Sequence, residues 1–117
     1  MRDPSFPADG ACGAWMRAAA LDDLWEDEMA RVRLAEADVL VVRLSGGEIH
    51  AYDNRCPHAG SPLSEGTLHA TTLRCDAHFW EFDARTGHGI NPRNCRLRRY
   101  PVKIVNGDVM VWVASPC

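Results

Sequence analysis

Short stretches of alternating apolar and polar residues run along the chain, and residues that favour turns separate them. The clearest pair lies near the C-terminus, where residues 101–105 and 108–113 flank Asn106-Gly107. An Asn-Gly pair between such runs is the strongest short-range signal for a β-hairpin. A second hairpin is predicted from residues 38–44 and 48–53, which Ser45-Gly46-Gly47 joins.

The remaining periodic segments are short as well. Residues 29–34 alternate apolar residues with arginine, which predicts a half-buried strand, and residues 20–25 predict one helical turn. We expect further strands at residues 15–19, 71–74 and 79–82, and core positions for Trp15, Trp25 and Trp112. Many short strands without a long helix predict an all-β fold, a small antiparallel sandwich or barrel.

Length and composition narrow the class of protein to which the chain can belong. The chain has 117 residues, which suits one domain; we assign residues 14–117 to it and residues 1–13 to a flexible N-terminal arm. With no apolar run long enough to span a bilayer and no secretory signal, we expect a cytoplasmic protein with no membrane partner. The net charge of −3 gives no support for a nucleic-acid partner.

Two short motifs carry the chemistry: Cys56-Pro57-His58 and Cys75-Asp76-Ala77-His78, which residues 59–74 separate. Two thiolates and two imidazoles form the ligand set of a [2Fe–2S] centre in which one iron binds both cysteines and the other both histidines. Residues 59–66 are rich in Gly, Pro and Ser, which favour tight turns whose N–H groups can face inorganic sulfide. We therefore predict Cys56, His58, Cys75 and His78 as the metal ligands of one such cluster per chain.

Zinc is the alternative metal, because two cysteines and two histidines also form a structural zinc site. Common zinc motifs, however, pair Cys with Cys and His with His. Each motif here runs from Cys to His, which favours the iron–sulfur cluster.

Both motifs, with their order and spacing, resemble the Rieske family. The resemblance implies a Rieske-type fold in which two ligand loops form a cluster-binding part, about residues 54–95, with the histidine-bound iron near the surface. In more detail, the chain is similar to the Rieske ferredoxin component of multicomponent toluene monooxygenases and of related aromatic and alkene monooxygenases. The most discriminating segment is Gly87-His88-Gly89-Ile90-Asn91-Pro92. The other matching residues are Leu21-Asp22-Asp23-Leu24-Trp25, Glu28-Met29, Leu63-Ser64-Glu65-Gly66, Cys75 to Trp80 with Phe82, Thr86, Cys95, Leu97, Tyr100, Pro101 and Val102.

This resemblance implies an electron carrier that is not itself an enzyme. It would take one electron at a time from an NADH-dependent reductase with flavin and iron–sulfur groups, and pass it to a diiron hydroxylase. We expect a monomer when free, with both partners docking around His58 and His78. Three alternatives stay open: the ferredoxin of a ring-hydroxylating dioxygenase, the small subunit of a nitrite-reductase-like enzyme, and a zinc-binding interaction module.

High-potential Rieske proteins carry an extra cysteine beside each ligand pair and a serine after the second histidine. Ser61 and Ala77 stand at the cysteine positions here, and Phe79-Trp80 follows the histidine. Fewer hydrogen bonds to sulfur stabilise the added electron less, so we expect a potential of about −150 mV.

The remaining cysteines and histidines receive structural interpretations. Cys12 and Cys117 are expected as free thiols without a role, and Cys95 as a packed thiol. His50 and His69 are expected at surface or partly buried positions, and His88 in a structural role. The acidic run Glu26-Asp27-Glu28 is expected to be a solvated face.

Overall fold

The computed structural model describes residues 12–57, 60–76 and 79–115, and within these ranges all regular elements except two 3-10 turns are strands. The strands are β1 (Gly13–Ala20), β2 (Glu28–Leu34), β3 (Ala37–Arg43), β4 (Ile49–Asp53), β5 (Thr67–His69), β6 (Thr72–Arg74), β7 (Glu81–Asp83), β8 (Gly89–Asn91), β9 (Arg99–Tyr100), β10 (Val102–Val105) and β11 (Asp108–Ala114). The 3-10 turns are η1 (Leu21–Asp23) and η2 (Leu63–Glu65).

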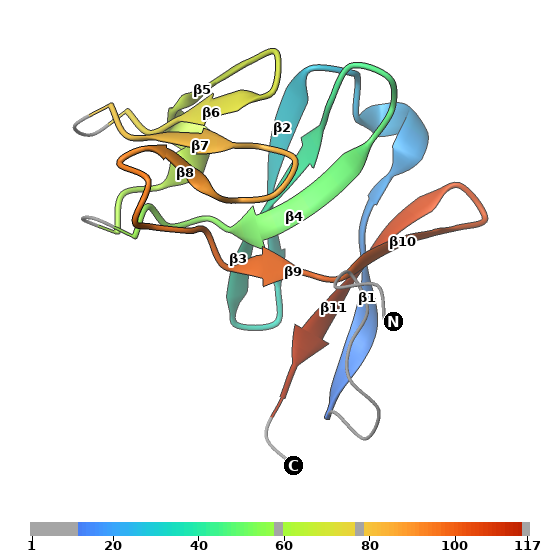
Figure 1. Cartoon of the computed structure of the whole chain (residues 1–117). Coiled ribbons are helices and arrows are strands. Elements are labelled where there is room, and N and C mark those ends of the chain that lie inside the picture. The colour runs from blue at the N-terminus through green and yellow to red at the C-terminus, as the bar shows by residue number, and fades with distance from the viewer. Residues whose placement is uncertain (1–11, 58–59, 77–78, 116–117) are drawn as a thin grey trace, which may run out of the picture.

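These strands form three antiparallel sheets, which confirms the all-β prediction (Figure 1). Two sheets, β1-β11-β10 and β2-β3-β4-β9, make up the base of the molecule, and the sheet β5-β6-β7-β8 makes up a separate part. The two Cys/His motifs follow β4 and β6, so the small sheet and the loop between β4 and β5 correspond to the predicted cluster-binding part.

Both predicted hairpins are present. β3 pairs with β4 across the Gly46-Gly47 turn, and β10 pairs with β11 across Asn106-Gly107. The two turn residues of the second hairpin have φ values of 50° and 80°, the left-handed conformation that a two-residue hairpin turn requires at both positions. Turn chemistry in the sequence therefore positions these strands.

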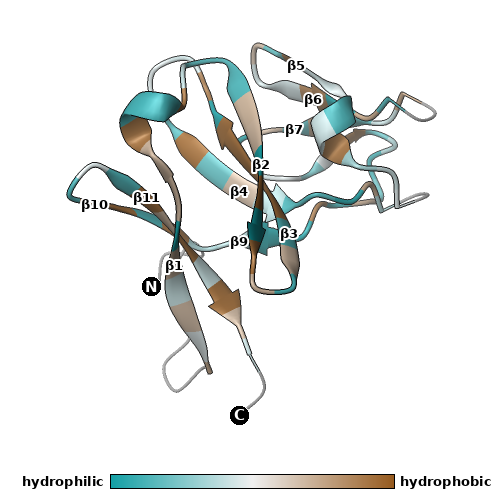
Figure 2. Cartoon of the chain, turned by 180° about the vertical axis from the view of Figure 1, so that it is seen from behind, coloured by the Kyte–Doolittle hydropathy of each residue, from teal (hydrophilic) through white to brown (hydrophobic). Residues whose placement is uncertain are grey.

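Two groups of buried side chains hold the sheets together. One group lies within the base and includes Val39 and Val41 of β3 and Val109 and Val111 of β11. Both strands have brown, hydrophobic stretches in Figure 2. The other joins β3 and β4 to the small sheet, and it contains the buried residues Leu40, Val42, Leu44, Tyr52, Cys56, Leu63, Leu73, Cys75, Phe82, Ala84 and Leu97. Strand β3 is buried on both faces and contributes to both groups, which explains its unbroken valine and leucine run.

The structure corrects several expectations. Trp25 is not in the core: its side chain is 73% exposed on the acidic turn after η1, while Trp15 and Trp112 are half-buried neighbours on β1 and β11. The strand expected at residues 79–82 begins only at Glu81, because Phe79 has a φ of 54° and lies in the loop. Glu26, Asp27 and Glu28 are exposed, as predicted.

Cys12 is disulfide-bonded, so the prediction of a free thiol there is wrong. Cys117 lies outside the described residues, and so do residues 1–11 of the predicted arm; β1 already begins at Gly13. No helix among the described residues is long and apolar enough to cross a membrane.

Candidate metal centre

The first ligand loop leaves β4 and turns sharply around Cys56. The Cys56 N–H donates to the carbonyl of Ser61 (2.9 Å), and the Gly60 N–H donates to the carbonyl of Cys56 (2.8 Å). Gly60 has a φ of 71°, a left-handed conformation that glycine adopts without strain. These bonds close the loop and hold the Cys56 side chain in the interior, where the residue is 2% exposed.

Asn54 fixes both ends of this loop and is itself buried. Its Oδ1 accepts from the Ser64 N–H (2.8 Å), and its Nδ2 donates to Ser64 Oγ (3.0 Å). The Asn54 N–H also donates to the Asp38 carbonyl on β3 (2.8 Å). Sequence reasoning missed this residue; its only sequence signal is a polar side chain between a buried strand and the first cysteine.

The second ligand loop joins β6 to β7, and Cys75 lies at its base. The Cys75 N–H donates to the Trp80 carbonyl (2.7 Å), which closes the loop directly above the antiparallel pair. Cys75 is completely buried, whereas Phe79 is 58% exposed, with the Arg74 guanidinium 4.4 Å from its ring centroid.

A third loop follows β8 and contains Cys95. The Cys95 Sγ donates to the Pro92 carbonyl (3.4 Å), and the Gly89 N–H donates to the Cys95 carbonyl (2.8 Å). A side chain at position 89 would collide with the carbonyl oxygens of Pro92 and Cys95, so this turn requires glycine. Burial raises the pKa of the Cys95 thiol, and the neighbouring Cys56 thiol raises it further, so Cys95 stays protonated. The prediction of a packed free thiol is confirmed.

The fold brings Cys56 and Cys75 into the same buried group, although 18 intervening residues separate them in the sequence. Neither cysteine is in a disulfide, and each lies at the base of its own loop. Two buried sulfur donors from adjacent loops fit the soft, anionic half of the predicted ligand set, because a thiolate in an apolar interior requires a metal or another positive partner.

His58 and His78 lie outside the described residues, so their predicted ligand role rests on the sequence motifs. Within the described ranges, no group of three His, Cys, Asp or Glu side chains gathers in a geometry that could hold a metal. His69 and His88 are exposed, in line with their predicted non-ligand roles.

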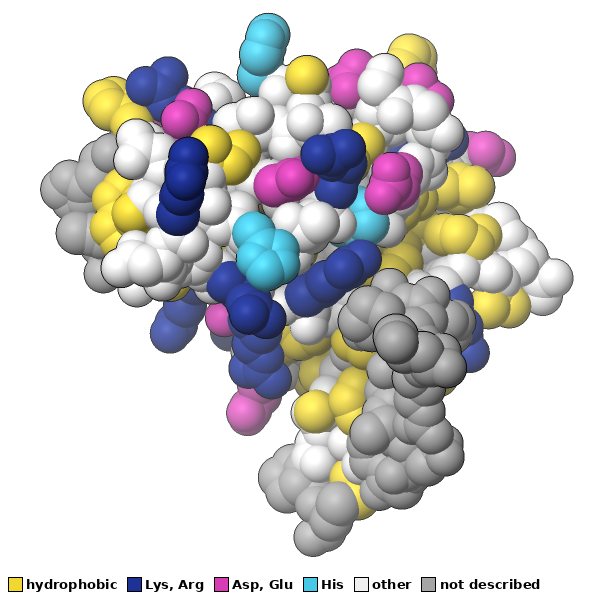
Figure 3. Space-filling view, in the orientation of Figure 1, with side chains coloured by type: hydrophobic (Ala, Val, Ile, Leu, Met, Phe, Trp, Pro, Cys, Tyr) yellow, Lys and Arg dark blue, Asp and Glu magenta, His cyan; other side chains and the backbone are white. Residues whose placement is uncertain are grey.

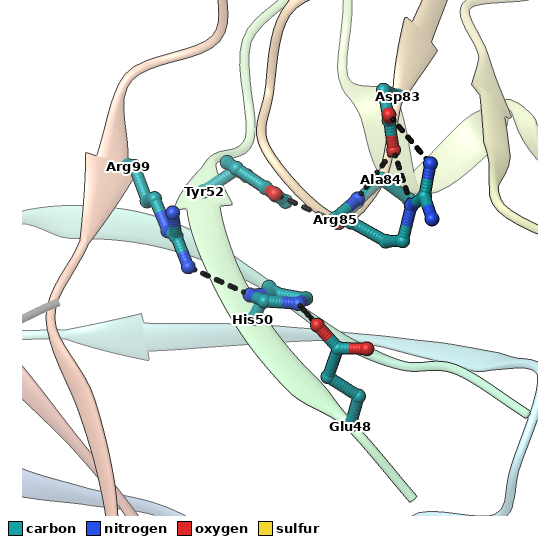
Figure 4. Close-up of polar contacts among 7 residues, drawn as sticks. All are labelled: Glu48, His50, Tyr52, Asp83, Ala84, Arg85 and Arg99. Atoms are coloured by element: carbon teal, nitrogen blue, oxygen red, sulfur yellow. Dashed lines mark hydrogen bonds and ion pairs between the residues drawn. The ribbon is translucent and has the colours of Figure 1, made fainter. Parts of the chain in front are cut away.

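His50 is more buried than the surface or partly buried position expected for it: it is only 6% exposed and lies between two charged side chains (Figure 4). Arg99 Nη2 donates to its Nδ1 (3.0 Å), so the ring proton is on Nε2, which donates to Glu48 Oε1 (2.8 Å). Burial lowers the pKa of His50, and the Arg99 charge lowers it further, while Glu48 opposes both effects. His50 is therefore a neutral structural histidine.

Tyr52, two residues along β4, ties the base to the small sheet. Its hydroxyl donates to the Ala84 carbonyl beyond β7 (2.7 Å), as Figure 4 shows. Burial raises the pKa of Tyr52 strongly, so the hydroxyl remains a donor at every physiological pH. This bond holds the part of the molecule that carries Cys75 against the part from which the first ligand loop emerges.

Comparisons with known proteins agree with this arrangement. The sequence profile of the Rieske [2Fe-2S] domain matches residues 14–101. The chain is 41% identical over 98 residues to the ferredoxin component of the alkene monooxygenase system of Xanthobacter autotrophicus, with 83% of this chain and 80% of that protein covered. It is 35% identical over 98 residues to the ferredoxin component of the naphthalene 1,2-dioxygenase/salicylate 5-hydroxylase systems of Ralstonia, with coverage of 83% and 93%.

Among solved structures, the complex of reduced oxygenase and oxidised ferredoxin in carbazole 1,9a-dioxygenase contains a chain with the same fold. The TM-score is 0.75 at 29% identity, and the match covers 83% of this chain and 91% of that one.

Proposed function

Because this chain belongs to the Rieske family of [2Fe–2S] proteins, we propose that it carries single electrons from an NADH-dependent reductase to the diiron hydroxylase of an aromatic or alkene monooxygenase system. The observation that supports this most directly is the pair of buried cysteines outside any disulfide, Cys56 and Cys75, at the bases of two adjacent loops. The relatives of this chain are ferredoxin components of oxygenase systems.

In this proposal Cys56 and Cys75 bind one iron, and His58 and His78 bind the other. The cluster supplies a site that accepts and returns one electron. The chain contributes a rigid frame: backbone hydrogen bonds close both loops, and Tyr52 and Asn54 hold them to the base. Since the four ligands fill the coordination of both irons, the chain offers no open metal position for substrate and acts as a carrier, not as an enzyme.

The donor is proposed to be a reductase with flavin and iron–sulfur groups. The ferredoxin of a ring-hydroxylating dioxygenase is the second candidate, and the 35% identity to the Ralstonia ferredoxin component favours it. The segment from Gly87 to Pro92 and the 41% identity to the alkene monooxygenase ferredoxin favour the monooxygenase system. Reconstitution with both kinds of oxygenase component separates the two: faster electron delivery to the dioxygenase would overturn the diiron assignment.

The ligand assignment has a direct test. We expect His58→Ala, His78→Ala, Cys56→Ala and Cys75→Ala each to abolish the visible absorption and the EPR signal of the dithionite-reduced protein. His69→Ala and Cys95→Ser are the matched controls and should keep both signals, because neither residue is a proposed ligand. A native spectrum in any of the four ligand variants contradicts the assignment. A colourless wild type with stoichiometric zinc would identify a zinc-binding module instead.

A further inference from the structure

Positive charge is concentrated in one continuous part of the chain. Residues 84–107 contain six of the 13 Lys and Arg residues and none of the 16 acidic residues, so the remainder of the chain has a net charge of −9. This segment includes β8, the third loop, β9 and β10. A molecule with a net charge of −3 thus has one strongly basic region.

The structure places this region beside the first ligand loop. Arg96 and Arg98 line a surface hollow of about 320 Å³ together with Arg55, and Cys56 and Pro57 form part of the same wall. On their other side, Arg96 and Arg98 border a second hollow of about 570 Å³, which His88 and Arg99 also line. Figure 3 shows the resulting gathering of dark blue side chains, with a cyan histidine, over the middle of this face. We call Arg55, Arg96 and Arg98 the basic ridge.

The basic ridge is exposed, and its arginines form no ion pair with the described residues. Arg17, Arg31 and Arg85 each form an ion pair with an aspartate. By contrast, none of the three ridge arginines pairs with a carboxylate of the described residues, although Asp53 lines the first hollow. Arg98 lies over the ring of Tyr100, 5.4 Å from its centroid, which keeps its stem close to the surface. Glu36, Asp38 and Asp53 line a neighbouring hollow with Arg55 and Arg98, but none of them forms an ion pair with the ridge. The arginines therefore repel one another, and an acidic surface from outside relieves this repulsion.

We propose that the basic ridge is the docking surface for an acidic patch on the oxygenase component, an inference that rests on the proposed electron-carrier function. Arginine forks bind carboxylates in pairs of hydrogen bonds, and such charges accelerate and orient encounter more than they tighten the final complex. A partner seated on the ridge contacts the wall of Cys56 and Pro57, and therefore lies against the loop that carries the first predicted ligand pair. A nucleic acid fits less well, because the rest of the chain would repel an extended polyanion.

Small redox probes test the surface without any partner. The dithionite-reduced protein is mixed by stopped flow with tris(oxalato)cobaltate(III), a trianion that takes up one electron and becomes cobalt(II). A local positive surface predicts that the oxidation rate falls about tenfold between 10 and 500 mM NaCl, because salt screens the attraction. If only the overall charge of −3 mattered, the trianion would be repelled, and the oxidation rate would rise as salt screens this repulsion. A rising rate overturns the proposal.

Charge reversal locates the effect. In Arg96→Glu/Arg98→Glu we expect the salt dependence to reverse, and in the milder Arg96→Gln/Arg98→Gln to flatten, with visible absorption confirming an intact cluster. Arg17→Glu is the matched control: it reverses an equally exposed charge on β1 and should behave as the wild type. Equal behaviour of all variants places the docking surface elsewhere.

The partner assay uses the reductase and oxygenase components of the Xanthobacter alkene monooxygenase system, with that system's own ferredoxin as the positive control. We expect the glutamate double variant to raise the ferredoxin concentration at half-maximal hydroxylation about tenfold at low salt, with little difference at high salt. If the wild type supports turnover and the glutamate double variant has the same half-saturating concentration, the docking surface is overturned but the carrier function is not. A wild type that supports no turnover overturns the proposed acceptor, and the probe kinetics then decide on the surface alone.

Discussion

His50 shows how a single residue can connect charge, burial and stability. Its ring is buried, accepts from Arg99 and donates to Glu48, so both nitrogens have partners only in the neutral tautomer. Protonation would put a hydrogen on Nδ1 and direct it at a guanidinium. The favourable contact with Glu48 survives protonation, but the one with Arg99 does not.

This arrangement predicts a loss of stability on mild acidification. The pKa of His50 is lower in the folded chain than its unfolded value of about 6.5. Below about pH 6.5 the unfolded chain therefore binds a proton that the folded chain does not, and the free energy of unfolding falls as the pH decreases. Above about pH 7 both states are neutral at this position and the contribution is constant.

The measurement is urea unfolding of the wild type and of His50→Gln from pH 5 to pH 8. The advantage of the wild type over His50→Gln should be constant above pH 7 and shrink toward pH 5. Asp38 and Asp83 have lowered pKa values, but they act at more acidic pH and are present in both proteins. A difference that stays constant down to pH 5 would contradict the neutral assignment of His50.

Local chemistry explains which residues the sequence allows one to place. The Asn-Gly and Gly-Gly turns determine their own φ values, and the alternation in residues 29–34 reports one buried face, so these strands are predictable. Trp25 shows the limit, because an aromatic ring at a helical spacing suggests burial, but the backbone after η1 turns this ring into solvent. The backbone N–H of Trp25 donates to Glu28 Oε1 (2.8 Å). The burial of His50 was not predictable for the converse reason, because its half-buried partner Arg99 lies 49 residues away in the sequence.

At the scale of elements, Asn54 ties the two ends of the first predicted ligand loop together through its side chain. Asn54→Ala removes both side-chain bonds to Ser64 and the longer one to Asp38 Oδ1 (3.4 Å), and it leaves the half-buried Ser64 N–H without its acceptor. We expect a loss of roughly 1–3 kcal/mol in the free energy of unfolding, and a faster loss of visible absorption on dilution into chelator. Ser64→Ala removes only the hydroxyl acceptor and should cost less. Equal effects of the two substitutions would show that the Asn54 carbonyl does not hold the loop.

The junction between the base and the small sheet has its own test in Tyr52→Phe. This substitution keeps the packing and removes the bond from Tyr52 to the buried Ala84 carbonyl, so we expect a loss of about 1–3 kcal/mol. Tyr100→Phe is the matched control, because its hydroxyl makes no hydrogen bond to the described residues and the substitution should be nearly neutral. A neutral Tyr52→Phe would mean that water replaces the bond without cost.

Elements of two or three residues escape sequence prediction for a different reason. Strands β5, β8 and β9 are too short to show a period, and they exist because β6, β7 and β4 offer them edges to pair with. The two ligand motifs, by contrast, are readable because metal ligation requires particular residue types at particular spacings. The fold then confirms what spacing alone cannot show, that Cys56 and Cys75 share one buried group.

At the scale of the whole molecule, acidic and basic side chains gather on different parts of the surface, and the basic part borders a predicted ligand loop. The acidic turn, with exposed Asp22, Asp23, Glu26, Asp27 and Glu28, leads from η1 into β2 on the base, whereas the basic ridge borders the first ligand loop. In the proposed function, the cluster lies at the end of the molecule that carries the two predicted ligand loops, and donor and acceptor must both approach that end. The two partners therefore have the same small area available to them.

Shared access predicts competition between the reductase and the oxygenase component. With ferredoxin limiting and the oxygenase component fixed, the NADH-driven hydroxylation rate should rise as reductase is added and then fall, because excess reductase occupies the carrier. Additional ferredoxin should restore the rate. Each complex should also be weak and short-lived, since a shuttle must dissociate in every cycle and electron-transfer interfaces are small. A rate that reaches a plateau and stays there at high reductase would show that both partners bind at once, and the docking surface for the reductase would then lie away from the cluster end.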